Sequence, residues 1–218
     1  MLEKDIRILC TALSLGLSYN NIEKTVDKAK YLSSFQARHL CTSKNKNYRT
    51  LNQDFYGYIA YQDSYRLKQI YSLIITLNGI VTEKQNEEKV KVLDLGCGFS
   101  HLINAFTGQP NNIIVNGIEY QKDIVNYMNN YYTGLNLVTQ GDLTKLSKKC
   151  IQLISNADIL YSYVPISNVD IYIEAYEFII SKMKKGALLI EVGASNNTWY
   201  RENKLLERTK LSYMFIKK

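Results

Sequence analysis

The stretch that decides the fold runs Val90-Lys91-Val92-Leu93-Asp94-Leu95-Gly96-Cys97-Gly98-Phe99-Ser100. Its apolar run ends in an acid and a Gly-x-Gly turn, which is typical of a buried parallel strand that bends sharply into a helix. Glycine is favoured at such a turn because the bend, and the close approach of a ligand to the backbone, leave no room for a Cβ. The following helix directs its free N–H groups over the turn. The stretch therefore predicts a nucleotide-type site in an α/β fold.

The spacing of the turn separates two kinds of nucleotide site. A dinucleotide fingerprint needs a third glycine three residues after Gly98, and that position is His101. The run from Val92 to Gly98 instead resembles motif I of the class I S-adenosylmethionine (SAM)-dependent methyltransferases, although Ser100 stands where the family often has a further glycine. The resemblance implies SAM as the cofactor, with Asp94, Gly96, Cys97 and Gly98 at its methionine end. A glycine turn in another α/β protein is the alternative.

Two further acids follow in register with this motif. The apolar run Ile113 to Glu119 predicts a second strand that ends in a carboxylate, which can accept both hydroxyls of a ribose. Glu119 lies where methyltransferases carry this acid, and Tyr120 is placed to lie against the adenine. Asp142, after a third predicted strand at 135–139, resembles the family residue that accepts a hydrogen bond from the adenine amino group.

The segment 158–166 predicts a fourth strand and the loop beyond it, which in this family borders the transferable methyl group. Adenine N6-methyltransferases show a polar residue and two prolines here, whereas this chain has Tyr163-Val164-Pro165-Ile166. No Pro-Cys pair supplies a nucleophile for cytosine. The loop resembles more closely that of seven-stranded protein lysine methyltransferases. Tyr161 is assigned to the cofactor site, and Tyr163 is the one candidate catalytic group, since no obvious general base is present.

The composition bounds the class of protein. The chain has 218 residues, 46% of them hydrophobic, and a formal net charge of +7, which is enough for one large domain or for a domain with a helical extension. Lys and Arg outnumber Asp and Glu by 9 to 4 in residues 1–50 and by 6 to 2 in 201–218, but not in 51–200, where they are 12 against 14. Basic ends suit a polyanion or an acidic protein as partner, but solvated helix faces are the preferred explanation.

The cysteines and the apolar runs point to a reducing, non-membrane setting. Cys10, Cys41, Cys97 and Cys150 are scattered, so we expect buried thiols and no metal site. The apolar run 8–17 is too short to span a bilayer and follows mixed charges. We expect a cytoplasmic protein without membrane contact.

Helical spacing predicts an N-terminal helical region. Apolar residues favour helices near 6–17, 20–30, 33–41 and 63–79, with a polar loop at 44–49, an aromatic cluster at 55–65 and a charged linker at 83–89. The first three helices loosely suggest a helix-turn-helix, but the turn lacks glycine and Asp27-Lys28 do not fit, so a helical cap over the cofactor cleft is preferred. The aromatic cluster could form a lid, stack on bases or pack the cap.

The remainder alternates strands and helices, as a parallel βαβ array does. Helices are predicted at 101–106, 124–131, 170–185 and 200–208, and strands at 188–192 and 211–216. Because the family normally ends in a helix and an antiparallel hairpin, the C-terminal end looks abbreviated.

The sequence therefore predicts an α/β, Rossmann-like, mostly parallel sheet flanked by helices, with a helical cap at 1–85, a SAM-binding core at 86–218 and an abbreviated end. The expected activity is methyl transfer to an N or O atom of a macromolecule, protein or RNA rather than DNA, with a possible partner subunit. A non-catalytic SAM-fold binding module and a small-molecule methyltransferase remain alternatives. Aminopropyl transfer is a weaker one, since its usual acid in the fourth-strand loop is missing.

Overall fold

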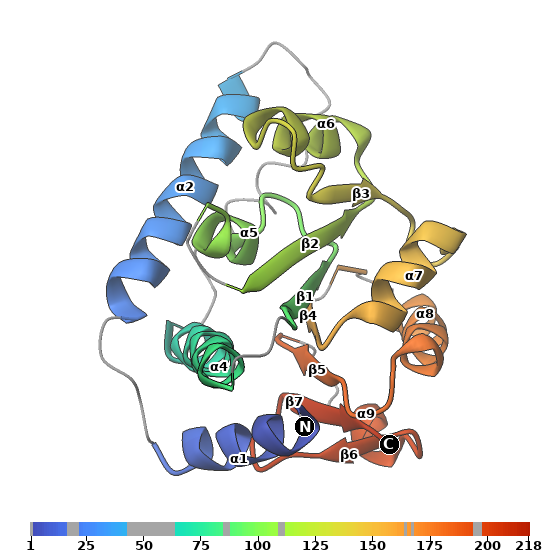
Figure 1. Ribbon diagram of the computed structural model, residues 1–218. Helices are drawn as coiled ribbons and strands as arrows, with labels where there is room; N and C mark the ends of the chain where they lie inside the picture. The colour runs from blue at the N-terminus through green and yellow to red at the C-terminus, as the bar shows by residue number, and fades with distance from the viewer. Residues whose placement is uncertain are drawn as a thin grey trace.

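The computed structural model describes residues 2–16, 22–42, 64–84, 88–108, 112–163, 165–166, 168–193 and 198–218. These residues build one seven-stranded sheet in the order β3-β2-β1-β4-β5-β7-β6 (Figure 1). Neighbouring strands from β3 to β5 are parallel, and β7 is antiparallel to both β5 and β6. The strands are β1 (Val90–Leu95), β2 (Ile113–Glu119), β3 (Val138–Gln140), β4 (Ile159–Ser162), β5 (Leu188–Glu191), β6 (Leu206–Arg208) and β7 (Met214–Lys217).

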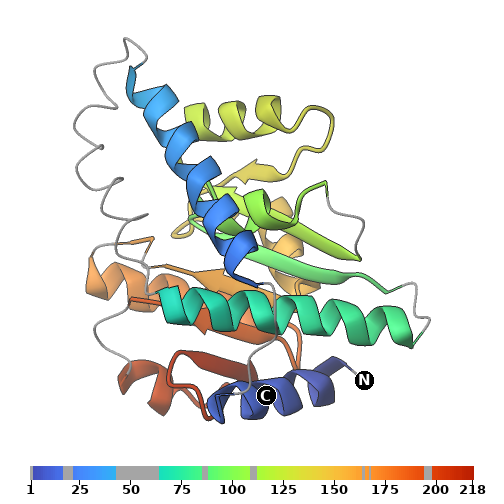
Figure 2. The ribbon, with the colours of Figure 1, turned by 90° about the vertical axis from the view of Figure 1, so that its left-hand side faces the viewer.

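Helices cover both faces of the sheet. One face carries α1 (Leu2–Ser14), α2 (Ile22–Thr42), α4 (Ser64–Glu83), α5 (His101–Phe106) and α6 (Lys122–Tyr131) (Figures 1 and 2). The other face carries α7 (Lys148–Asn156), α8 (Val169–Lys182) and α9 (Thr198–Glu202). Because side chains alternate along a strand, Val90 and Val92 of β1 join the first core, while Leu93 and Leu95 join the second. The predicted fold class is confirmed.

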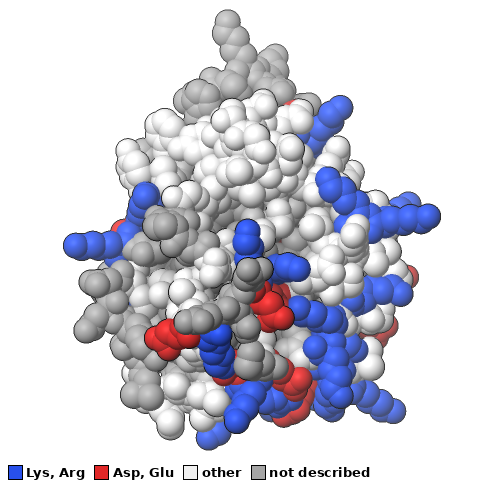
Figure 3. Space-filling view, in the orientation of Figure 1, with Lys and Arg blue, Asp and Glu red and all other residues white. Residues whose placement is uncertain are grey.

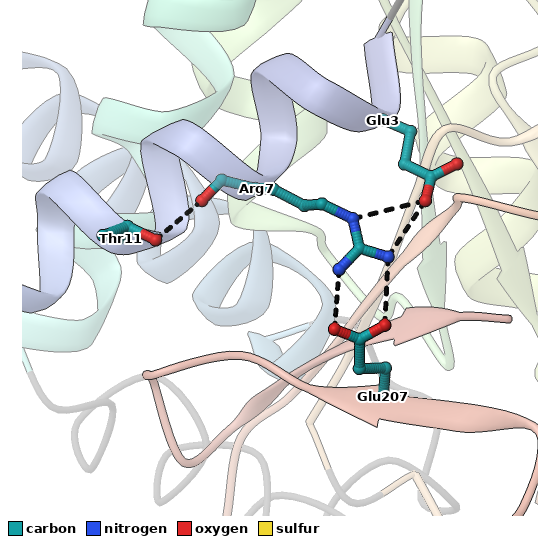
Figure 4. A network of polar contacts seen from close by, with 4 residues as sticks. All are labelled: Glu3, Arg7, Thr11 and Glu207. Atoms are coloured by element: carbon teal, nitrogen blue, oxygen red, sulfur yellow. Dashed lines mark hydrogen bonds and ion pairs between the residues drawn. The ribbon is translucent and has the colours of Figure 1, made fainter.

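The N-terminal helices share a core with the sheet. Ile6 of α1, Val26 of α2 and Ile74 of α4 are buried in the same cluster as Val92 and Ile216 of the strands. At the sheet's far edge, Arg7 of α1 forms a bidentate ion pair with Glu207 of β6, at 2.7 and 3.1 Å, and also bonds Glu3 (Figure 4). The domain boundary at residue 85 stays a prediction.

Several predicted elements differ from the structure. The two helices expected at 20–30 and 33–41 are one helix, α2, because no glycine or proline interrupts the chain between them. The helix-turn-helix interpretation required a third helix separate from the second, and residues 22–42 form one continuous helix instead. Helix α4 continues past Gly79 to Glu83, since a single glycine is tolerated inside a helix. The aromatic cluster lies outside the described residues, except Tyr65, which is exposed.

The C-terminal end contains helix α9 and two strands, β6 and β7, where one helix and one strand were predicted. The segment Leu206–Arg208, predicted as the end of a helix, is strand β6, and with β7 it completes an antiparallel pair. Strand β3 is shorter than expected because Gly134 and Asn136 adopt positive φ angles before it. Helix α7 was missed, although Ser147 caps it by accepting a hydrogen bond from the Cys150 N–H. None of the described helices has both the length and the apolar character that a bilayer crossing needs.

Candidate functional site

The strand order places a topological switch point at the carboxyl end of β1. The chain leaves β1 for β2 on one side and later returns to β4 on the other, so β1 and β4 flank the topological switch point of the sheet. Ligands of open α/β sheets bind outside the carboxyl ends of the strands at this point. Asp94 of β1 pairs in register with Gly117 of β2 and with Tyr161 of β4. Asp94 and Tyr161 therefore lie side by side on the two strands that border the switch point.

The glycine turn needs its glycines for two reasons. Gly96 and Gly98 have φ angles of 65° and 50°, in the left-handed region that other residues rarely adopt. A Cβ on Gly96 would lie 2.2 Å from the Cβ of Pro165, because the loop after β4 packs directly on the turn. Behind the turn, Cys97 fills the space next to Gly117, where a Cβ would lie 2.4 Å from its sulfur. Cys97 thus packs the turn against β2, and burial raises the pKa of its thiol.

Glu119 ties the end of β2 to the glycine turn. Its Oε2 accepts a hydrogen bond from the Gly98 N–H at 2.9 Å, and its Oε1 accepts one from the Gln121 N–H at 2.8 Å. Burial raises the pKa of this carboxyl group, while the backbone N–H groups of Gln121, Gly98 and Tyr120 oppose the shift. An ionised carboxylate has about four acceptor positions, so each oxygen keeps one for a further donor. Glu119 can therefore hold the turn and still accept two ribose hydroxyls.

Asp94 is a buried acid without a cationic partner among the described residues. Its Oδ2 accepts a hydrogen bond from Ser100 Oγ at 2.6 Å, and Ser100 Oγ accepts in turn from the Ile103 N–H at the start of α5. Burial is the main cause that raises the pKa of Asp94 to about 8, the Ser100 hydrogen bond opposes it, and the charge of Glu119 adds to it. Two buried acids this close to bare glycine backbone fit a cationic ligand, and SAM carries a sulfonium and an ammonium group.

The remaining predicted residues lie around this centre with different exposure. Tyr161 is buried beside Asp94, and burial raises the pKa of its hydroxyl. Tyr163 is half-buried, and its pKa is raised by burial and lowered by Arg66, so it is a neutral phenol near pH 7. Tyr120 is 70% exposed at the end of β2, open to stack on a ring. Asp142 follows β3, and its Oδ1 accepts hydrogen bonds from the N–H and hydroxyl of Thr144.

The sequence identified the acids and glycines but missed the residues that hold them. Ser100 was read as a substitute for glycine, whereas it both caps α5 and bonds Asp94. The pattern Ser-x-x-Ile before a short helix could have revealed the cap. Ser33 and Asn104, which contact the carbonyl of Phe99, had no signal because Ser33 lies 66 residues from Phe99 in the chain. Among the described residues, no three His, Cys, Asp or Glu side chains are grouped so as to hold a metal.

The strand order and the antiparallel β7 define the Rossmann-like fold of the class I SAM-dependent methyltransferases. No family model and no curated protein matches the sequence. Solved structures match at low identity. They include the YcgJ protein of Bacillus subtilis, 18% identical over 51% of this chain and 47% of that one with a TM-score of 0.37. The glycopeptide N-methyltransferase MtfA bound to SAM is 13% identical over 60% and 58% with a TM-score of 0.38.

A variant of MtNAS in complex with SAM covers more of the chain. It is 12% identical over 99% of this chain and 97% of that one, with a TM-score of 0.43. The chain spans about half the length of several structures it matches, 47% of YcgJ and 58% of MtfA. Likenesses at this level do not transfer an activity, and the assignment of the fold stands on the strand order and the glycine turn.

Proposed function

We propose that the chain binds SAM at the carboxyl ends of β1 and β2 and transfers its methyl group to an N or O atom of a macromolecule, a protein or an RNA. The observation that carries the proposal is the hydrogen bond from the Gly98 N–H to Glu119, at the switch point of a class I methyltransferase sheet. This hydrogen bond joins the glycine turn after β1 to the acid at the end of β2, which are the two most specific motifs of the sequence. Asp94, next to the same turn, supplies a second acid for a cationic cofactor.

Each residue of the site has a task in this proposal. Glu119 would accept the two ribose hydroxyls, and Asp142 the adenine amino group. Tyr120 would lie against the ring. Asp94 and the backbone of Gly96 and Gly98 would hold the methionine end. Bound SAM would supply a methyl group on its sulfonium: a lone pair of the substrate would form the new bond to the methyl carbon as the C–S bond breaks, and S-adenosylhomocysteine would leave with the electron pair of that bond. The protein contributes orientation and exclusion of water.

Tyr163 fits a positioning role better than that of a base. Because burial raises its pKa, the phenol stays protonated near pH 7 and can donate or accept a hydrogen bond to the substrate. An amine that arrives neutral needs no proton removed before the transfer. The phenol would then align the attacking atom, and the loss of its hydroxyl would slow the transfer without abolishing SAM binding.

The distribution of charge supports a macromolecular substrate. Lys145, Lys148 and Lys149 are exposed and follow Asp142 directly, so positive side chains border the adenine end of the site. On the face seen in Figure 3, Lys and Arg gather along the side of α7 and α8, with Asp and Glu among them near the base. A polyanion or an acidic protein surface would be attracted to such an edge, and the attraction would weaken with salt.

The first test is titration calorimetry with SAM and S-adenosylhomocysteine on wild type, Glu119→Ala and the control Glu174→Ala, an exposed acid on α8. We expect binding of both ligands, a loss of at least about 100-fold in affinity for Glu119→Ala, since two charge-assisted hydrogen bonds go with it, and no change for the control. Absence of binding to the wild type would contradict the proposal and favour a binding module that acts without SAM.

A second test addresses the substrate class. The protein is incubated with methyl-tritiated SAM and a cell extract, and the products are treated with ribonuclease or with protease. Label that protease releases identifies a protein substrate, and label that ribonuclease releases identifies RNA. Label found only in small molecules would refute the macromolecular part of the proposal and leave SAM binding intact. The Glu119→Ala protein is the control for background transfer.

A further inference from the structure

The glycine turn is fixed by three separate anchors. The Gly98 N–H donates to Glu119 of β2, and Ser100 Oγ donates to Asp94 of β1. The third anchor holds the carbonyl of Phe99, which lies between them. It accepts hydrogen bonds from Asn104 Nδ2 at 2.8 Å and from Ser33 Oγ at 3.2 Å. The first two anchors belong to the strands, whereas the third brings in the N-terminal helix α2.

The third anchor is a buried polar network between α2 and α5. Asn104 Nδ2 lies 2.7 Å from Ser33 Oγ and 3.0 Å from Gln36 Oε1, and Asn104 Oδ1 accepts from the hydroxyl of Tyr132. Ser33, Gln36 and Asn104 are at most 5% exposed. Figures 1 and 2 show α2 lying across α5 from the outside. We call the Ser33, Gln36 and Asn104 side chains the α2 brace.

A purely structural contact would not need these polar side chains. Two helices pack more favourably through apolar residues, because buried polar groups lose hydration that hydrogen bonds only partly restore. Further along α2, the side chains of Ile22, Val26 and Ala29 are buried in the apolar core. The polar residues occur where α2 meets the turn, and Ser33 and Asn104 share the Phe99 carbonyl as their acceptor.

We propose that the α2 brace sets the conformation in which the glycine turn receives the cofactor, with Asn104 as the positioning residue. The inference rests on the proposed SAM site and adds the N-terminal helix to its machinery. Asn104 touches the turn and not the ligand. It acts by fixing the carbonyl of Phe99, so that the neighbouring Gly98 N–H stays on Glu119 and the Ser100 hydroxyl stays on Asp94. A preformed turn lowers the ordering cost of binding.

The decisive variants separate positioning from stability. Asn104→Ala removes the amide donor that contacts the Phe99 carbonyl, Ser33 Oγ and Gln36 Oε1. The triple variant Ser33→Ala/Gln36→Leu/Asn104→Leu replaces the whole brace by apolar side chains and keeps the helix contact. Ser33→Ala alone removes only the longer of the two bonds to Phe99. The control is Asn78→Ala in α4, which removes a comparable 2.8 Å hydrogen bond, to the Asn112 N–H, at the amino ends of the strands.

We expect Asn104→Ala and the triple variant to bind SAM about tenfold or more weakly, Ser33→Ala a few-fold more weakly, and Asn78→Ala like wild type. The triple variant should keep its thermal midpoint within a few degrees, and the Gly98 amide should exchange with solvent faster in both brace variants. SAM affinities within twofold of wild type in both, or unchanged Gly98 exchange, would overturn the inference. If the triple variant does not fold, Ser33→Ala and Asn104→Ala decide by the same criteria.

The outcomes also distinguish this inference from the proposed function. If the wild type binds no SAM, the proposed function fails, and the Gly98 exchange rate still shows whether the brace sets the turn. If the wild type binds and the brace variants bind equally well, only the inference fails.

Discussion

Two carboxylates lie at strand ends in two regions of the sheet, and they accept hydrogen bonds from different kinds of donor. Glu119 ends β2 and accepts hydrogen bonds from backbone N–H groups, beside glycines that carry no side chain. Glu191 ends β5 and accepts a hydrogen bond from the Tyr172 hydroxyl at 3.0 Å. The ring of Tyr172 stacks on that of Tyr176, with the two centroids 4.2 Å apart. Both acids are buried.

The difference shows how a fold keeps one strand end for a ligand and closes another. Where the backbone supplies the donors, no side chain has to enter the space, and a ligand can approach the main chain. Where tyrosines supply the donors, their rings occupy that space. Tyr200 of α9 completes the second region, stacking on Phe215 and bonding the Tyr172 hydroxyl. We expect the first region to bind and the second to stabilise.

The largest expected effect concerns the bare backbone at the first region. Gly96→Ala introduces a Cβ at a φ of 65° and against Pro165. We expect a loss of about 2–4 kcal/mol in the free energy of unfolding, from the left-handed backbone and the overlap together, and weaker SAM binding. Denaturant unfolding and calorimetry measure the two.

The matched control for this variant is Gly79→Ala inside α4, where nothing lies within 4 Å of the added Cβ and the φ angle is ordinary. It should be stabilising by up to about 1 kcal/mol, because alanine is the better helix former. Equal losses for the two variants would contradict the requirement for glycine at the turn.

The second prediction uses the pKa of Asp94, which burial raises to about 8. Because the folded protein retains this proton above the pKa of the unfolded chain, the stabilising contribution is full below about pH 4 and is lost as the pH rises through 8. The stability of the ligand-free protein should therefore fall by about 2.5 kcal/mol more in wild type than in Asp94→Asn between pH 5 and 7, at about 1.4 kcal/mol for each pH unit. Urea unfolding across this range measures the difference. Parallel pH profiles would show that Asp94 is already ionised in the free protein.

The third prediction tests the second region. Tyr172→Phe removes the hydroxyl that donates to Glu191 and contacts Tyr200. We expect a loss of about 1–3 kcal/mol in the free energy of unfolding, because a buried carboxylate loses a donor, and no change in SAM affinity. Tyr31→Phe on the exposed side of α2 is the control and should be neutral. A drop in SAM affinity for Tyr172→Phe would place Glu191 within the binding site. It would contradict the division into one region that binds and another that stabilises.

The smallest effect is expected at a third carboxylate, Glu207, which lies exposed at the edge of the sheet. Arg7→Ala removes its ion pair with Glu207 and the one with Glu3 (Figure 4). Since exposed pairs are screened by solvent, we expect a loss of less than about 1 kcal/mol that shrinks with added salt. Thermal midpoints at low and high salt, with Lys4→Ala as control, measure it. A larger, salt-independent loss would show that α1 depends on Arg7 to stay on the sheet.

The sequence predicted the parallel core well because its signals there are local. The bounds of α5 and β2 were predicted to the residue, since a glycine turn, an apolar run and a terminal acid each mark a boundary. The N-terminal helices and the tail were predicted less well. The break inside α2 was an error because no glycine or proline stands between the two predicted helices. The helix in place of β6 was an error because short mixed segments favour helix and strand almost equally until they pack.

What the sequence determined by itself was the type of site: an acid, a glycine turn and a second acid, each at a strand end, with spacing that resembles the class I methyltransferases. What only the tertiary structure decided was how these residues are held. It alone brings the Gly98 N–H to Glu119, raises the pKa of Asp94 by burial, and sets Ser33 of α2 against the Phe99 carbonyl. Short-range patterns follow from backbone preferences and the alternation of side chains. Contacts between residues dozens of positions apart depend on how the helices pack on the sheet, and no local pattern records that packing.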